Sequence, residues 1–178
     1  VGSRKASLQG LYIASELSKG LAEAGFLIMS GLARGIDGAA HRAALKSPVG
    51  KTGAICGTGL DRVYPYEHLA LAEAVAHSGL LISEFPPGVG PKPFHFPRRN
   101  RLISGLSLGC LVVEANLKSG SQITARLSAE QGREVFAIPG SIHSPLAKVT
   151  LFVFSGTVAA LTGAIAAQSA SNMVPKAC

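Results

Sequence analysis

The segment from Lys92 to Arg101, KPFHFPRRNR, places four formal cations and two phenylalanines within ten residues. Cationic side chains bind phosphates, and a phenylalanine ring offers a face on which an unpaired base can stack. Asn100 can hydrogen-bond to a base edge or cap a helix. The alternative is an ordinary surface loop that covers its own phenylalanines, and we expect Phe94 or Phe96 to be buried. The candidate nucleic-acid-binding residues of this segment are Lys92, Phe96, Arg99, Asn100 and Arg101.

Three turns between an apolar run and an expected helix carry glycines and hydroxyl side chains. They read GSR from Gly2, SGLARGID from Ser30 and SGSQIT from Ser119. Small residues let the backbone approach an anion, and the free amides of a helix start can bind phosphate. Asp37 lies at a helix start and is a plausible N-cap. We expect it to be structural and not a ligand contact, because a carboxylate would repel phosphate. The candidate phosphate-binding residues are Ser3, Arg4, Ser30, Gly31, Arg34, Gly35, Gly120 and Ser121.

Several short patterns resemble catalytic motifs but stand in the wrong context. Residues 105–109, GLSLG, fit GxSxG, but the expected helix precedes this serine and the strand follows it. Residues 50–52, GKT, lack the glycine that a Walker A loop needs five residues earlier. The chain has three cysteines, without a CxxC pair, and its histidines lack HxxxH spacing. We therefore expect no catalytic residue, no metal and no cofactor, and a protein that is not an enzyme.

Short apolar runs alternate with segments of helical periodicity along most of the chain. This alternation predicts an α/β fold: a doubly wound, mostly parallel sheet with helices on both faces. In such a sheet the three turns share the carboxyl edge of the strands, which suits a ligand with several phosphates. A net charge of +7 fits a polyanionic partner, and equally an ordinary basic protein. Expected helices span 11–24, 36–45, 68–77, 99–106 and 123–131; expected strands span 26–29, 52–56, 80–83, 110–113 and 135–138; a proline-rich loop spans 85–97.

The two ends of the chain give separate expectations. Only Val1 precedes the first turn, so the first strand is expected to be truncated. The start does not read as a signal peptide, and the cysteine usage favours a reducing compartment, which together predict a cytoplasmic protein. The tail contains an uncharged, mostly apolar run of 17 residues, LFVFSGTVAALTGAIAA, at the lower limit for a membrane span. We expect a buried element or an aberrant end there, no membrane association, and two segments, 1–146 and 147–178.

The ordered blocks GSR, SGLARGIDGAAH, GTGLDRVYP, LISEFPPG, HFPRRNRLISGLSLGCLVVEA and SGSQITARLSAEQGREVFAIPGSIHSPL resemble the DNA-processing protein A family, also called DprA or Smf. They cover residues 1–146, and the tail from residue 147 does not resemble the family. The resemblance implies a Rossmann-like domain that binds single-stranded DNA without sequence preference. It further implies protection of strands in natural transformation, loading of the RecA recombinase, and a homodimer.

Carried over by position, the resemblance assigns roles to the same segments. Arg4 is then the arginine of the first turn, and Gly31 and Gly35 belong to the glycine loop. The basic and aromatic wall consists of Lys92, Phe96, Asn100 and Arg101. No catalytic residue is carried over.

Two other functions stay open at this point. A phosphoribohydrolase-like enzyme would need a PGGxGTxxE signature, whereas the corresponding segment, ANLKSGSQITARLSAE, lacks Pro-Gly-Gly and places Glu130 late. A scaffold that binds an acidic protein through the basic segment is the third hypothesis.

Overall fold

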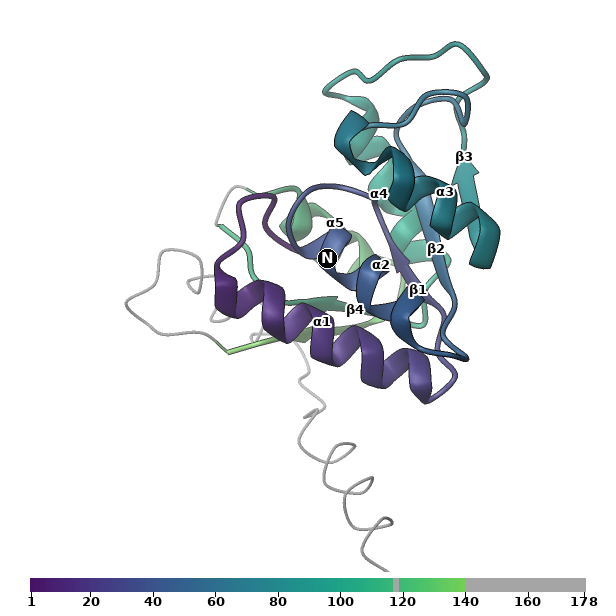
Figure 1. The fold of residues 1–178 in the computed structure, drawn as a ribbon. Coiled ribbons are helices and arrows are strands. Elements are labelled where there is room, and N and C mark those ends of the chain that lie inside the picture. The colour runs from purple at the N-terminus through teal and green to yellow at the C-terminus, as the bar shows by residue number, and fades with distance from the viewer. Residues whose placement is uncertain (117–118, 140–178) are drawn as a thin grey trace, which may run out of the picture.

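The computed structural model describes residues 1–116 and 119–139 as strands and helices that alternate along the chain (Figure 1). The elements are α1 (Leu8–Glu23), β1 (Ile28–Ser30), α2 (Ile36–Lys46), β2 (Thr52–Cys56), the 3₁₀ turn η1 (Tyr66–His68), α3 (Leu69–Ser78), β3 (Leu80–Ser83), α4 (His95–Gly105), β4 (Gly109–Val112), α5 (Gly120–Glu130) and β5 (Glu134–Ala137). The expectations for the tail beyond residue 146 lie outside the described residues.

All strand pairs among the described residues are parallel. The strands form one sheet in the order β1–β2–β3 and a second sheet of β4 and β5. The N-terminal segment runs beside β4, where Gly2 pairs with Glu114 and the Val1 nitrogen donates to the Leu111 carbonyl at 2.9 Å. Parallel pairing confirms the predicted α/β class, although the described strands divide into two sheets instead of one.

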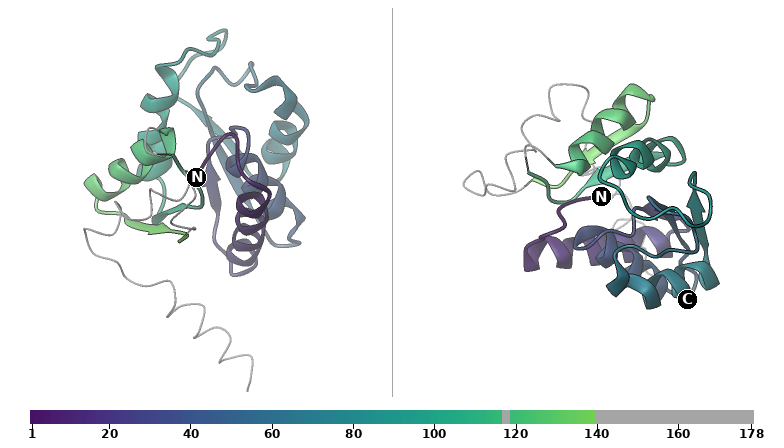
Figure 2. Two further views of the ribbon diagram at one scale, coloured as in Figure 1. Left: turned by 90° about the vertical axis from the view of Figure 1, so that its left-hand side faces the viewer. Right: turned by 90° about the horizontal axis from the view of Figure 1, so that it is seen from above.

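Helices cover the strands from two sides (Figure 2). Helices α1, α2 and α3 lie on one side, and α4 and α5 pack together on the other. The core is built from small aliphatic side chains, with three clusters of buried residues. Helix α2 buries four alanines, which let its neighbours approach closely. The buried alanines of α2 are Ala39, Ala40, Ala43 and Ala44.

Helix α1 follows the predicted pattern closely. Ser7 is its N-cap, and the Ser7 hydroxyl oxygen accepts a hydrogen bond from the Gly10 amide at 3.0 Å. Gly25 follows the helix with a φ of +91°, a conformation that side chains other than glycine rarely adopt. The predicted end of the helix at this glycine is confirmed.

Four predicted element starts differ from the structure by two residues or more. Helices α1 and α5 each begin three residues earlier than predicted, at Leu8 and Gly120. Helix α4 begins at His95, not at Arg99, so much of the basic segment is helix and not loop. Pro97 is tolerated because it lies in the first helical turn, where backbone amides have no intrahelical acceptor. Strand β1 begins at Ile28, and Phe26 and Leu27 before it are 50% and 44% exposed.

Two negative findings concern the described residues alone. None of their helices is both long and apolar enough to cross a bilayer. Within residues 1–116 and 119–139, no group of three His, Cys, Asp or Glu side chains could hold a metal ion.

His41 of α2 is fully buried and connects this helix to β2 and to the loop after β1. Its Nε2 accepts the Leu32 amide at 3.3 Å, and its Nδ1 lies 2.7 Å from the Thr52 hydroxyl oxygen. The Thr52 hydroxyl donates its proton to the Ile28 carbonyl at 2.6 Å, so its oxygen accepts from His41. Nδ1 therefore carries the ring proton, and Nε2 is unprotonated. Burial lowers the pKa of His41 to about 4.

The neutral state of His41 predicts a pH-dependent stability. In the unfolded chain histidine has a pKa of about 6.5, so between that value and about 4 only the unfolded state binds the proton. The free energy of unfolding should therefore fall as the pH drops through this window, by about 3 kcal/mol from this residue. Urea unfolding at pH 7 and pH 4.5 measures the change. His41→Asn should be less stable at pH 7 and lose this part of the pH dependence; an unchanged dependence would contradict the assignment.

Candidate nucleic-acid interface

An open groove of about 480 Å³ lies between the N-terminal segment and the starts of α4 and α5. The N-terminal segment leads into α1 on one side of the sheets, whereas β4 leads into α5 on the other side. In open α/β folds, the point where successive connections leave on opposite sides is the usual ligand site. The predicted turns from Gly2 and from Ser119 both reach this groove.

The loop after β1 forms the floor, and its Gly31 is bonded on both sides. The Gly31 amide donates to Asp37 Oδ2 at 3.1 Å, and its carbonyl accepts from Arg99 Nη1 at 2.6 Å. A Cβ at this position would lie 2.5 Å from the Arg99 guanidinium. The expectation that the Gly31 amide faces a phosphate is wrong, because Asp37 occupies it. Asp37 is structural, as predicted, but it is not the N-cap.

Leu32, the next residue of the loop, is held in the same way. Its amide donates to His41, and its carbonyl accepts from His68 Nδ1 at 2.9 Å. Its φ of +56° is unusual for leucine, and its side chain is buried in the core. The loop is thus fixed by side chains of α2, η1 and α4.

Gly35 and Ser30 support the loop from its two ends. Gly35 is the N-cap of α2 with a φ of +70°, and a Cβ there would overlap the Ser3 carbonyl oxygen. Ser30 is 2% exposed, and its hydroxyl has no partner among the described residues. Both were predicted as phosphate contacts, but burial makes Ser30 a core residue, and Gly35 provides the close approach of two chain segments.

Arg99 was predicted to bind nucleic acid, but it is only 4% exposed. Its Nη1 donates to the carbonyls of Gly31 and Ile55, so it joins the ends of β1 and β2 to α4. Burial lowers the pKa of Arg99 from its usual value, and the nearby Asp37 carboxylate opposes this effect. Arg99 lines the groove from below as a supporting residue.

Asn100 and Ser121 fix the start of α5 beside the groove. The Asn100 side-chain amide donates to the Gly120 carbonyl at 3.1 Å. The hydroxyls of Ser119 and Ser121 lie 2.7 Å apart, and Gly120 between them is exposed. These predicted residues line the groove, and the amide of Asn100 serves the backbone instead of a base edge.

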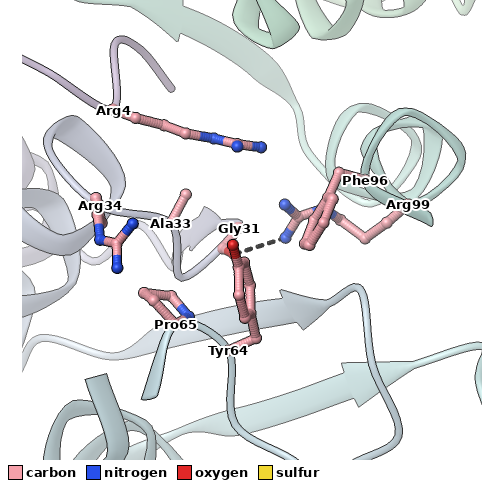
Figure 3. A pocket seen from close by; sticks show the side chains of 8 residues that line it. All are labelled: Arg4, Gly31, Ala33, Arg34, Tyr64, Pro65, Phe96 and Arg99. Carbon is pink, nitrogen blue, oxygen red and sulfur yellow. Dashed lines mark hydrogen bonds between the residues drawn. The ribbon is translucent and has the colours of Figure 1, made fainter. Parts of the chain in front are cut away.

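Arg4 and Phe96 are the predicted residues that the groove presents most openly. Arg4 is exposed, and its guanidinium carbon lies 5.3 Å from the Phe96 ring centroid (Figure 3). Phe96 is half-buried and Phe94 is 64% exposed, so the expected buried phenylalanine is not found. Ser3, beside Arg4, is buried, and its hydroxyl accepts the Lys5 amide at 3.2 Å.

Three predicted cations lie elsewhere. Arg101 pairs with Glu84 on another face of α4, and Lys92 lies 5.9 Å from the Phe94 ring centroid; neither lines the groove. Arg34 lines a small pocket beside the groove and pairs with Glu67.

The sequence analysis did not predict two residues of this region, Lys5 in the groove and Tyr64 in the small pocket beside it. Lys5 is an exposed cation in the groove, and its position directly after Arg4 was an available signal. Tyr64 stands 5.4 Å from Phe96 between ring centroids, in an aromatic VYPY segment that received no functional weight.

The sequence model of the family described as DNA recombination-mediator protein A matches residues 1–171. The chain belongs to this DprA/Smf family. The match extends past residue 146, where we expected a boundary, and that boundary stays a prediction because the described residues end at 139.

Named DprA/Smf relatives agree with this membership. DNA processing protein DprA of Bacillus subtilis is 48% identical over 147 residues, which are 83% of this chain and 49% of that protein. Protein Smf of Escherichia coli is 53% identical over 146 residues, or 82% of this chain and 39% of that protein. The chain therefore spans about half the length, or less, of these curated relatives.

Solved structures of the family share the fold. The X-ray structure of DprA from Streptococcus pneumoniae aligns with a TM-score of 0.83 at 44% identity, over 93% of this chain and 59% of that one. DprA from Helicobacter pylori, described for its single-stranded DNA binding mode, aligns with a TM-score of 0.79 at 30% identity, over 85% and 69% of the chains. These alignments confirm the Rossmann-like class predicted from the sequence.

The buried position of Arg99 predicts a structural role that its neighbour lacks. Arg99→Ala leaves the Gly31 and Ile55 carbonyls without their donor, so it should lower the free energy of unfolding by about 3 kcal/mol. Arg98→Ala, at an exposed position of the same helix, should change it by about 0.5 kcal/mol or less. Urea unfolding of both variants measures the two free energies. Equal losses in Arg99→Ala and Arg98→Ala would contradict the structural role of Arg99.

Proposed function

We propose that the groove binds the backbone of single-stranded DNA without sequence preference. The observation that carries this proposal is the exposed Arg4 beside the half-buried Phe96, in a groove that the start of α5 also lines. Arg4 and Lys5 supply positive charge for phosphates, and the amide end of α5 adds a partial positive charge. Phe96 offers a ring edge and face to a base that is not stacked in a duplex.

The buried framework supports binding rather than chemistry. The polar side chains around the floor, Asp37, His41, His68 and Arg99, are bonded to the backbone. Glu130, the carboxylate that a phosphoribohydrolase-like site would require, ends α5 and pairs with Arg126 at 3.4 Å. We therefore propose that the protein acts by binding and not as an enzyme.

Family membership supports the wider role that we propose. The relatives are named DNA processing proteins, and one solved relative is described for single-stranded DNA binding. In this proposal the protein acts in the cytoplasm on strands taken up in natural transformation or used in recombination. It passes them to the RecA recombinase and works as a homodimer. Lys92 extends the positive surface beyond the groove.

The proposal predicts that Arg4→Ala weakens DNA binding without unfolding the protein. Losing one exposed charge-assisted phosphate contact should lower the affinity for a labelled oligothymidylate about tenfold at low salt. The slope of log affinity against log salt should fall by about 0.7, because one fewer counterion is released. Fluorescence anisotropy at several salt concentrations measures both.

Lys19→Ala is the matched control for this experiment. Lys19 is an exposed cation of α1, paired with Glu23, and it lies outside the groove. Its removal should leave the affinity nearly unchanged. A folded chain that binds no single-stranded DNA at low salt would refute the proposed function, and equal losses in both variants would refute the groove as its site.

A further inference from the structure

A small pocket adjoins the groove and shares Arg4, Phe96 and Arg99 with it. Arg34 and Tyr64 line its other sides (Figure 3). Its free volume is about 20 Å³, which is room for about one water molecule. A phosphate can enter this pocket only if an exposed lining side chain moves.

Arg34 is the lining side chain whose charge is already engaged. Its Nη2 donates to Glu67 Oε2 at 2.6 Å, and its Nε donates to Glu67 Oε1, so the pair is bidentate. The hydrogen bond from Arg34 lowers the pKa of Glu67, and that bond raises the pKa of Arg34. A guanidinium binds the two oxygens of a carboxylate and of a phosphate with the same fork geometry.

The fold brings Arg34 and Glu67 together, but their ion pair is weak enough for another anion to replace the Glu67 carboxylate. Glu67 belongs to η1, which His68 ties to Leu32, two residues before Arg34 in the same loop. The two side chains are 55% and 52% exposed, so water competes with their contact and it adds little stability. Glu67 does not line the pocket, so a phosphate that took its place would release Arg34, the lining side chain, to move with it.

We propose that Glu67 occupies, in the free protein, the place of a DNA phosphate at Arg34, and that the pocket is a second phosphate subsite which opens when a strand extends beyond the groove. This inference rests on the proposed function. The ligand is a backbone phosphodiester of the same strand that lies in the groove. Glu67 thereby sets a minimum strand length, because only a strand that reaches Arg34 can displace it.

Glu67→Gln tests the inference, since glutamine keeps the shape of the side chain and removes its charge. Oligothymidylates of about 6 and about 20 nucleotides sample the groove alone and the groove with the pocket. The variant should bind the longer strand about fivefold more tightly than the unmodified chain does, with little gain for the shorter strand. Arg34→Ala should weaken binding of the longer strand, and adding Glu67→Gln to it should restore much less than fivefold.

Glu84→Gln is the matched control, because Glu84 also pairs with arginines, Arg98 and Arg101, that line neither the groove nor the pocket. It changes the net charge equally and should give a much smaller gain with the longer strand. Equal gains in both variants, or a gain from Glu67→Gln that persists in the Arg34→Ala background, would overturn the inference while leaving the proposed function standing. If the unmodified, folded chain binds neither oligonucleotide, the proposed function itself fails.

Discussion

The fixed backbone of Gly31 and Leu32 is the constraint on which the rest of the site depends. Four side chains bind the two amides and two carbonyls of these residues: Asp37, Arg99, His41 and His68. Each of the four is at most 7% exposed. Together they hold Leu32 at a positive φ that a leucine adopts only when its surroundings impose it. Removing any of them would leave a buried polar group without a partner, which costs more than the hydrogen bond itself contributes.

The arginines around this fixed backbone have two different roles. Arg99 is buried and holds the strand ends, whereas Arg4 and Arg34 stand exposed at the rim of the same floor. The side chains of α4 also lie on different faces of the helix. Phe96 and Asn100 face the groove, whereas Arg101 pairs with Glu84 on another face. A rigid floor with a few exposed side chains keeps the entropy lost on binding small, because only those side chains must be ordered.

The sequence predicted the elements better than the contacts of the site. Periodicity located α2, β2 and β3 almost to the residue, and the end of α1, because each is an uninterrupted apolar or amphipathic run. It failed at α4, where Pro97 suggested a loop although proline fits a first helical turn. The expected helix, 99–106, already contained Arg99 and Arg101, but its buried face was not identified, so both received the same role. The bond between Arg99 and Gly31 joins residues 68 positions apart, and no local pattern signals it.

A crystal structure of the 178-residue chain with a short oligothymidylate would show whether the groove holds the strand. We expect phosphates within hydrogen-bonding distance of Arg4 and of the amide end of α5, with one base against the Phe96 ring. The Gly31–Leu32 backbone should be unchanged. A strand bound along the face of α4 that carries Arg98 and Arg101, with the groove empty, would contradict binding in the groove.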